Sequence, residues 1–456
     1  RDKAFLDVMG HQGNDFQISG NFWRDLNALT KEFDVSGAFV CIPGYEWSAN
    51  TAVGGDRNVH FRREGETIHR SSHAQIFDGD DRLDEGSDAH DAHDLFRCLA
   101  GRDCVVAAHV GGRYADILFA HDQKLEAAVE VHSSWGTFEW IVQDAFEAGY
   151  RVGIVANSDG HKGRPGACYP GASFFGSRGG LTCFLAPRLD RDAIFEAMRR
   201  RHHYGTTGAR IFLDVTATLQ SDAELFLRDP AAFDHAESRK VRRVMMGDIA
   251  KVQDDEVEIS VRVVGSAPIE RVEILDGDRV IECHRPYSAA DLGARVRLMF
   301  QGAEYRGRAR TTTWDGSLVV DGNSIARTGV INNWNLDRGI RAQDKQNVAW
   351  KAVTTGNFGA IDLWLDQGIE GAIAFETPHV RGQRAIGALG LERHIFSAGG
   401  LDRAVQLYRL PETMTATDVT LRKRAAVALR GDTRLFVRVT QEDGNQAWSS
   451  PIYLFR

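Results

Sequence analysis

Several common signals are missing from this sequence, and each absence narrows the class of protein. No stretch of 18 consecutive apolar residues occurs, so the sequence predicts no membrane-spanning helix. Basic residues are not in excess: 55 lysines and arginines stand against 63 acidic residues, with a net charge of −8. The two signs are mixed along the chain, whereas nucleic-acid binders usually carry a basic stripe, so we expect no nucleic-acid partner.

The six cysteines include no Cys-x-x-Cys pair. Cys41, Cys104 and Cys183 lie in apolar runs, where buried free thiols are the ordinary expectation. This usage fits a reducing compartment, such as the cytoplasm, slightly better than an oxidising one.

The chain has 456 residues, which predicts two domains, and it starts at Arg1 without an initiator Met. We interpret it as a fragment or a processed form, so the sequence does not decide whether a signal peptide exists.

The first half alternates short apolar runs with amphipathic segments. The runs have the length of strands buried on both faces; they cover residues 6–9, 38–42, 104–108, 128–131, 152–156 and 181–185. Helical spacing of apolar residues occurs between them, over residues 21–33, 138–148 and 190–201. This alternation predicts a parallel sheet or an α/β barrel. Residues 50–90 interrupt it and are expected to form a long loop over one end of the barrel.

The second half has the pattern of antiparallel strands. Residues 257–263 alternate apolar and polar, and Asp276-Gly277 separates two alternating runs as in a hairpin. We therefore expect a barrel over residues 1–220, a helical or mobile connector over 221–250 and an antiparallel β-sandwich over 251–456.

Metal-binding side chains follow five successive predicted strands. They are His11, Glu46, His109, the pair Glu130 and His132, and the pair Asp159 and His161. The ends of barrel strands converge on one face, where active sites lie. Imidazoles with carboxylates and no thiolate suit zinc, manganese or iron, and a carboxylate such as Glu46 can bridge two ions.

These motifs resemble the PHP family, named for polymerase and histidinol phosphatase domains. The resemblance rests on His11, Pro43-Gly44-Tyr45-Glu46, Ala108-His109, Glu130-Val131-His132 and Ser158-Asp159-Gly160-His161, and it covers about residues 1 to 215. The chain's end, with 438–441 and 447–451, resembles a branch that carries a C-terminal β domain.

The resemblance implies a distorted (β/α)7 TIM-like barrel with two or three divalent ions (manganese, zinc or iron). Glu46 would bridge, Asp159 and His161 would bind different ions, and His11 and His109 would be further ligands. The remaining ligand would be His132, the commoner family choice, or Glu130. The family usually has Asp-His where this chain has Gly10-His11, which removes a carboxylate that would orient His11.

Other polar and aromatic residues near these motifs are candidates for substrate contacts. His60 and His203 could protonate a leaving group, and Arg113 and Arg164 could bind an anionic group. Trp47 and Trp135 could form an aromatic wall for an organic substrate, although core packing is the simpler explanation for them. The motif Ala89-His90-Asp91-Ala92-His93-Asp94 is interpreted as a solvated helix start.

The sequence thus predicts a metal-dependent hydrolase of a small-molecule ester. A phosphate ester is the family default; the alternative is a carboxylic or carbamate ester, bound by the tryptophans and by Phe174-Phe175. A second class of function also stays open, an inactive barrel that serves as a binding protein.

The family's first strand carries a His-x-His motif, and no such motif precedes His11. We therefore expect the first barrel strand to be missing from this chain, and an upstream segment or separate chain to complete the barrel.

Overall fold

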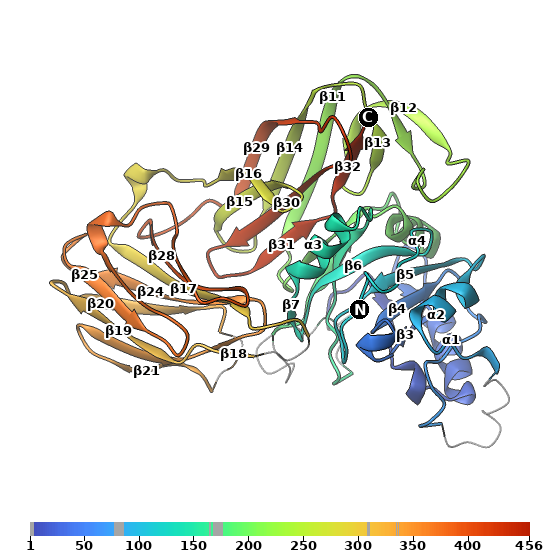
Figure 1. The fold of residues 1–456 in the computed structure, drawn as a ribbon, viewed down its shortest axis with the longest axis horizontal. Coiled ribbons are helices and arrows are strands. Elements are labelled where there is room, and N and C mark those ends of the chain that lie inside the picture. Colours follow the sequence, from blue (N-terminus) through green and yellow to red (C-terminus); the bar gives the residue numbers. More distant parts are fainter. Residues whose placement is uncertain are drawn as a thin grey trace.

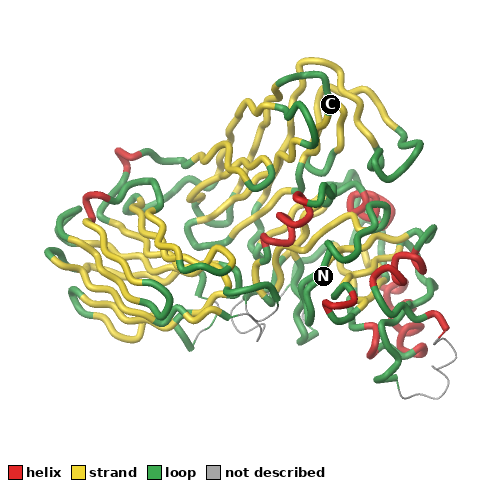
Figure 2. The backbone as a smooth tube through the Cα atoms, in the orientation of Figure 1, coloured by secondary structure: helices red, strands yellow, loops and turns green. Residues whose placement is uncertain are grey.

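A computed structural model describes residues 4–76, 86–163, 166, 177–307, 311–333, 335 and 337–456. The protein is mostly β, with 44% strand, 13% helix and four α-helices in the described part. Figures 1 and 2 show three regions: a mixed N-terminal region, a large sheet above it and a β domain at the far side. We call them the site domain (residues 4–206), the central sheet and the outer β domain (residues 295–410). No described helix is long and apolar enough to cross a membrane.

The site domain contains all four α-helices of the described chain. They are α1 Gly20–Phe33, α2 Ala92–Leu99, α3 Glu139–Glu147 and α4 Arg191–Arg199. Its strands are β1 Val8–Gly10, β2 Val40–Ile42, β3 Gly44–Trp47, β4 Arg57–Phe61, β5 Cys104–Ala108, β6 Glu126–Ser133, β7 Gly136–Thr137, β8 Gly153–Ala156, β9 Leu181–Phe184 and β10 His203–Thr206. Each of the apolar runs and helical patterns found in the sequence of this region overlaps one of these elements.

The prediction of a (β/α)7 TIM-like barrel is nevertheless wrong. Such a barrel needs parallel strands with a helix after each, whereas β4 runs antiparallel to both β3 and β5. Only Pro43 separates β2 from β3, so no helix fits there. At the other side β10 pairs with β31 Gln446–Ser449 of the central sheet instead of closing a ring.

Residues 50–90, expected to be one long loop, contain strand β4. Val59 and Phe61 are buried in the core between α1 and α2, while His60 faces the opposite side. This alternation is short and lies among charged residues, which is why the composition of the segment suggested a loop. Residues 77–85 lie outside the described part.

The central sheet has 12 strands and includes β9 and β10 of the site domain. Its other strands are β11 Phe212–Phe226, β12 Ser238–Met245, β13 Ile249–Lys251, β14 Glu256–Val264, β15 Ile269–Asp276, β16 Arg279–His284, β29 Asp418–Ala426, β30 Thr433–Gln441, β31 and β32 Ile452–Phe455. The expected connector 221–250 is therefore largely strand. Its alternating apolar residues, such as Ala223 and Leu225, are buried against the sheet core.

The outer β domain is inserted between β16 and β29. Two five-stranded sheets enclose its core, which contains Trp314 and Trp350. The strands are β17 Arg295–Ala303, β18 Thr312–Thr313, β19 Gly316–Asp321, β20 Ile325–Ile331, β21 Gly339–Gln343, β22 Asn347–Lys351, β23 Val353–Thr354, β24 Phe358–Leu365, β25 Ala372–Glu376, β26 Arg381–Ala385, β27 His394–Ser397 and β28 Leu401–Leu410. The single β-sandwich expected over 251–456 is thus replaced by a large sheet and a separate sandwich.

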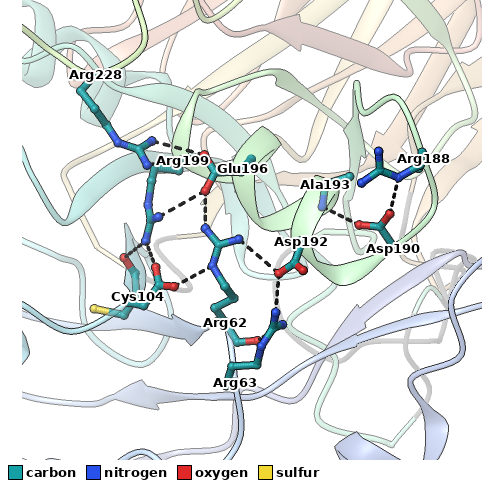
Figure 3. A network of polar contacts seen from close by, with 11 residues as sticks. Arg62, Arg63, Cys104, Arg188, Asp190, Asp192, Ala193, Glu196, Arg199 and Arg228 are labelled. Carbon is teal, nitrogen blue, oxygen red and sulfur yellow. Dashed lines mark hydrogen bonds and ion pairs between the residues drawn. The ribbon is translucent and has the colours of Figure 1, made fainter. Parts of the chain in front are cut away.

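An ion-pair network holds α4 beside the ends of β4 and β5. Arg62, just after β4, lies between Asp192 and Glu196 of α4 and also pairs with Asp103 (Figure 3). Arg199 at the end of α4 pairs with Asp103 from the other side. Because these pairs are partly exposed, we ascribe to them orientation of the helix more than net stability.

Candidate metal site

A cavity of about 570 Å³ lies inside the site domain, which is a size typical of small-molecule sites. Part of its lining is apolar and includes Ile42, Val105 and Val155. Five of the six predicted metal ligands line it: His11, Glu46, His109, Asp159 and His161. The strand ends therefore bring these side chains to one place, although the strands do not form the expected barrel.

Three of these side chains form a compact cluster. Ligand atoms of Glu46, His109 and Asp159 all lie within 4.8 Å of one another. His109 Nε2 lies 3.6 Å from Glu46 Oε2 and 3.2 Å from Asp159 Oδ2. Two carboxylates and one imidazole around a common point match the ligand types of zinc, manganese and iron sites.

The imidazole of His109 is oriented from behind by a buried carboxylate. Its Nδ1 donates to Glu130 Oε1 at 2.7 Å, and Glu130 Oε2 accepts from Asn157 Nδ2 at 2.6 Å. Because Nδ1 faces Glu130, Nε2 is the nitrogen that could bind a metal once its own proton is displaced. Carboxylate–histidine pairs of this kind are common behind metal-bound imidazoles. Glu130 was the alternative to His132 as the remaining metal ligand. In the structure it lies behind His109 and binds the imidazole.

Glu46 is held in a similar way through one carboxylate oxygen. Glu46 Oε1 accepts from Asn14 Nδ2 at 3.0 Å and from Ser48 Oγ at 2.7 Å. These bonds leave Oε2 directed at His109. The side chain is 5% exposed, so its position is fixed by packing as well as by hydrogen bonds.

The cluster concentrates negative charge in a buried place. Burial raises the pKa of Glu46 to about 7, and it does the same for Asp56, with the charge of Glu46 adding to the rise. Burial opposes protonation of His109, but the carboxylates of Glu130 and Asp159 outweigh it and raise the pKa of His109 well above its usual range. Without a metal the cluster therefore holds protons, which a divalent cation would replace.

Asp159 has two features expected of a metal ligand. Its Oδ2 atom is buried, and apart from the contact with His109 Nε2 at 3.2 Å it has no hydrogen-bond partner. Its backbone φ is +41°, a left-handed conformation that non-glycine residues rarely adopt and that often occurs at functional sites. A cation beside Oδ2 would satisfy that oxygen, so the residues present fit a divalent ion.

His11 and His161 line the cavity outside the compact cluster. Burial lowers the pKa of His11, which keeps its imidazole neutral as a metal ligand requires. The His161 side chain is 48% exposed, and its Nδ1 lies 3.7 Å from Asp159 Oδ1. The second and third ions that the resemblance implies therefore stay a prediction.

The structure does not bring His132 to the site. Its Nδ1 lies 2.8 Å from Thr137 Oγ1 and its Nε2 lies 3.0 Å from the carbonyl oxygen of Arg178. Both nitrogens are occupied, and the ring stacks on Trp448 of the central sheet. Glu130 lines the cavity and His132 does not, because a β-bulge between them shifts the pairing with β8 and turns His132 toward Trp448.

The two histidines proposed as proton donors both line the cavity. Gln12 Nε2 lies 3.1 Å from His60 Nδ1, and His203 Nδ1 lies 3.0 Å from the carbonyl oxygen of Ile154. Burial lowers the pKa of each to about 4. Both imidazoles are therefore neutral at pH 7. In that state each can donate a hydrogen bond to a leaving group, but neither carries an extra proton.

Arg113 is engaged within the protein. Its Nε lies 3.1 Å from Asp56 Oδ1 and 3.1 Å from the carbonyl oxygen of Ala49, to which it donates. Its charge compensates a carboxylate that is fully buried, which reduces its value for binding an anionic substrate. Arg164 and Phe174-Phe175 lie outside the described residues.

The two tryptophans do not line the cavity. Trp47 is completely buried, packs in the core beside α2 and donates from Nε1 to the carbonyl oxygen of Ala89 at 3.0 Å. The expected aromatic wall is wrong for this residue. Trp135 is 6% exposed and lies edge-on to His161, with ring centres 5.9 Å apart.

Sequence reasoning missed the residues that support the ligands. Asn14 and Ser48 hold Glu46, Asn157 holds Glu130, and Asp56 shapes the loop after His109 by accepting from Arg113 N at 2.7 Å. Asn157 and Ser48 each lie two residues from a predicted ligand, and this proximity in the sequence could have identified them. The Asp91 start of α2, by contrast, was expected: Asp91 Oδ1 accepts from Asp94 N at 2.8 Å.

Comparisons with known proteins add one partial likeness. Neither curated proteins nor solved structures give a match. The family model described as "Protein of unknown function (DUF3604)" matches residues 171–280, which include His203 but not Glu46, His109 or Asp159. This likeness covers less than half of the chain, and the description of that family names no activity.

Proposed function

We propose that this protein is a metal-dependent hydrolase that cleaves an ester-type bond in a small organic substrate. The observation that carries the proposal is the convergence of Glu46, His109 and Asp159 on one point of a 570 Å³ cavity. When bound there, a divalent ion would supply the Lewis acidity that hydrolysis at neutral pH requires. The resemblance to the PHP family agrees with this proposal.

The chain's own residues would orient the ligands and the substrate. Glu130 fixes the His109 ring, and Asn14 with Ser48 fixes the Glu46 carboxylate, so little reorganisation is needed on binding. His60 lies on the cavity wall with Nδ1 facing the Gln12 amide, so its proton is on Nε2. From there it could donate a hydrogen bond to the leaving oxygen.

The cavity lining favours a substrate with an apolar portion. Ile42, Val105, Val155 and Phe184 are among the lining residues, and Arg113 is already paired with Asp56. A carboxylic or carbamate ester suits this surface, whereas a phosphate ester would depend on the bound cations for charge compensation. Both remain within the proposal, since the same metal chemistry serves both.

The test is a rate comparison on nitrophenyl phosphate and nitrophenyl acetate, with the protein loaded with Mn²⁺ or Zn²⁺ and after chelation. We expect hydrolysis that needs the metal and that is lost in Asp159→Ala, because that variant loses an anionic ligand. The matched control is His93→Ala, because His93 is an exposed histidine of α2 that does not line the cavity. Full activity in Asp159→Ala, or a metal-loaded protein inert on both esters, would contradict the proposal.

A further inference from the structure

We propose that the outer β domain positions the Asp159 loop: its turn at residues 355–357 holds the β6–β7 hairpin, and Ser134 of that hairpin holds Asp159. The consequence for metal binding rests on the proposed function, whereas the mechanical link does not. Ser134 is thus a positioning residue, and the outer β domain helps to set the geometry of the site.

The first half of the link joins the hairpin to the ligand loop. Ser134 Oγ donates to the carbonyl oxygen of Asp159 at 2.8 Å, and Ser134 N donates to the carbonyl oxygen of Ser158 at 3.3 Å. On the other side of the turn, Trp135 packs edge-on against His161. Asp159 has a positive φ, so these contacts help to hold a conformation that the residue would otherwise leave.

The second half joins the hairpin to the outer β domain. Thr137 N of β7 donates to the carbonyl oxygen of Thr355 at 3.0 Å. The two backbones approach so closely that a Cβ at Gly136 would overlap Thr355, and a Cβ at Gly356 would overlap the carbonyl oxygen of Thr137. Figure 1 shows β7 at this junction between the two regions.

The turn that makes this contact is itself rigid. Asn357 Oδ1 accepts from Thr355 N at 2.8 Å, and Thr354 Oγ1 donates to the carbonyl oxygen of Gly302 at 2.7 Å. Thr354, Thr355 and Asn357 are all at least 96% buried. A displacement of the turn would therefore reach the hairpin instead of being absorbed locally.

A second contact fixes the outer β domain near the same place. Arg306 Nη2 donates to Asp144 Oδ1 of α3 at 2.6 Å, and the Arg306 guanidinium lies over the ring of Trp140, 5.0 Å from its centre. Since α3 begins two residues after β7, both contacts hold the segment that leads away from the hairpin.

The experiment compares Gly356→Ala with Gly399→Ala in the full chain. Both glycines are in the outer β domain with φ of +82° and +71°, so alanine strains the backbone similarly; only at Gly356 does the Cβ meet another residue, since Gly399 has nothing within 4 Å. Amide hydrogen exchange of residues 157–163 is measured without metal, and Mn²⁺ affinity is measured by titration.

We expect faster exchange at 157–163 and about tenfold weaker Mn²⁺ binding in Gly356→Ala, the lower end of the effect of disturbing groups that orient ligands. Gly399→Ala should match the unmodified protein in both. Ser134→Ala should reproduce the Gly356→Ala effects, and the double variant should add little, since both changes break one link.

If Gly356→Ala does not fold, Asn357→Ala replaces it, because it removes only the acceptor for Thr355 N. Unchanged exchange at 157–163 in the folded variant would overturn the inference. If the unmodified protein binds no Mn²⁺, the proposed function fails instead, and the exchange comparison still decides whether the outer β domain holds the loop.

Discussion

Glu130 lies directly behind His109, with Oε1 2.7 Å from Nδ1, and both side chains are at least 98% buried. This contact orients the ring so that Nε2 faces Glu46 and Asp159, and it keeps a proton on Nδ1. Glu130→Gln keeps the shape but removes the charge, and the amide can turn its NH₂ toward Nδ1. We expect metal affinity to fall about 10- to 100-fold, the usual effect of changing such a partner. Metal titration of the purified variant measures it, and affinity within twofold of the original would contradict this role for Glu130.

A buried ion network should hold the outer β domain to the central sheet. Arg297 of β17 is fully buried and pairs with Asp362 of β24 and with Glu270 of β15. Arg297→Met removes the arginine that joins the two carboxylates and leaves Asp362 with Arg295 and Glu270 with Arg271 as their remaining partners. Because a buried charge network loses one cation, we expect a loss of about 3 kcal/mol in the free energy of unfolding. Denaturant unfolding measures it.

The matched control is Arg262→Met. Arg262 of β14 pairs with Asp418 on an exposed face, where both side chains are more than half exposed. We expect little change in stability there, because solvent screens such pairs. Equal effects of the two substitutions would show that the buried network does not stabilise the junction.

Two buried histidines should make the protein sensitive to acid. Burial lowers the pKa of both His132 and His203 to about 4. The unfolded chain therefore binds protons first as pH falls below about 6.5, and stability is lost progressively down to pH 4, by about 3 kcal/mol for each group. Unfolding midpoints of His132→Gln should fall less steeply over this window than those of the unmodified protein. An identical pH slope would mean that His132 does not titrate as described.

Trp47 should matter for stability and not for substrate binding. Trp47→Phe removes the donor to the Ala89 carbonyl and leaves a void in the core, so we expect a loss of about 1–3 kcal/mol in the free energy of unfolding. KM should stay unchanged, because the ring does not reach the cavity. A raised KM with unchanged stability would restore the aromatic wall expected from the sequence.

Local pattern and residue chemistry predicted the elements and most of the cluster. The apolar run before His109 and the run before Asp159 both form strands, and both side chains reach the cavity. Strand ends are readable because the residue types change abruptly there. The register of β6 was not readable. Glu130 and His132 are two residues apart, which predicts a common face, but a bulge between them shifts the pairing with β8, so that Glu130 lines the cavity and His132 stacks on Trp448.

The arrangement of the strands depends on long-range pairing, which local sequence patterns did not predict. The antiparallel insertion of β4 and the pairing of β10 with β31 depend on contacts between residues far apart in the chain, about which local periodicity is silent. The same holds for the contact between Thr137 and Thr355, which brings the outer β domain to the site. The predicted fold class was therefore wrong, although the strands and helices predicted for the site domain are present.

The most direct test of the metal site is the metal content of the pure protein after chelation and reloading with Mn²⁺ or Zn²⁺. Asp159→Asn is compared with the unmodified protein and with His93→Ala. Asparagine keeps the shape of Asp159 but removes the charge of its carboxylate. We predict at least one tightly held ion per chain in the unmodified protein and in His93→Ala, and a loss of that ion in Asp159→Asn. Equal metal content in all three proteins, or none in any of them, would contradict the assignment of Glu46, His109 and Asp159 as a metal site.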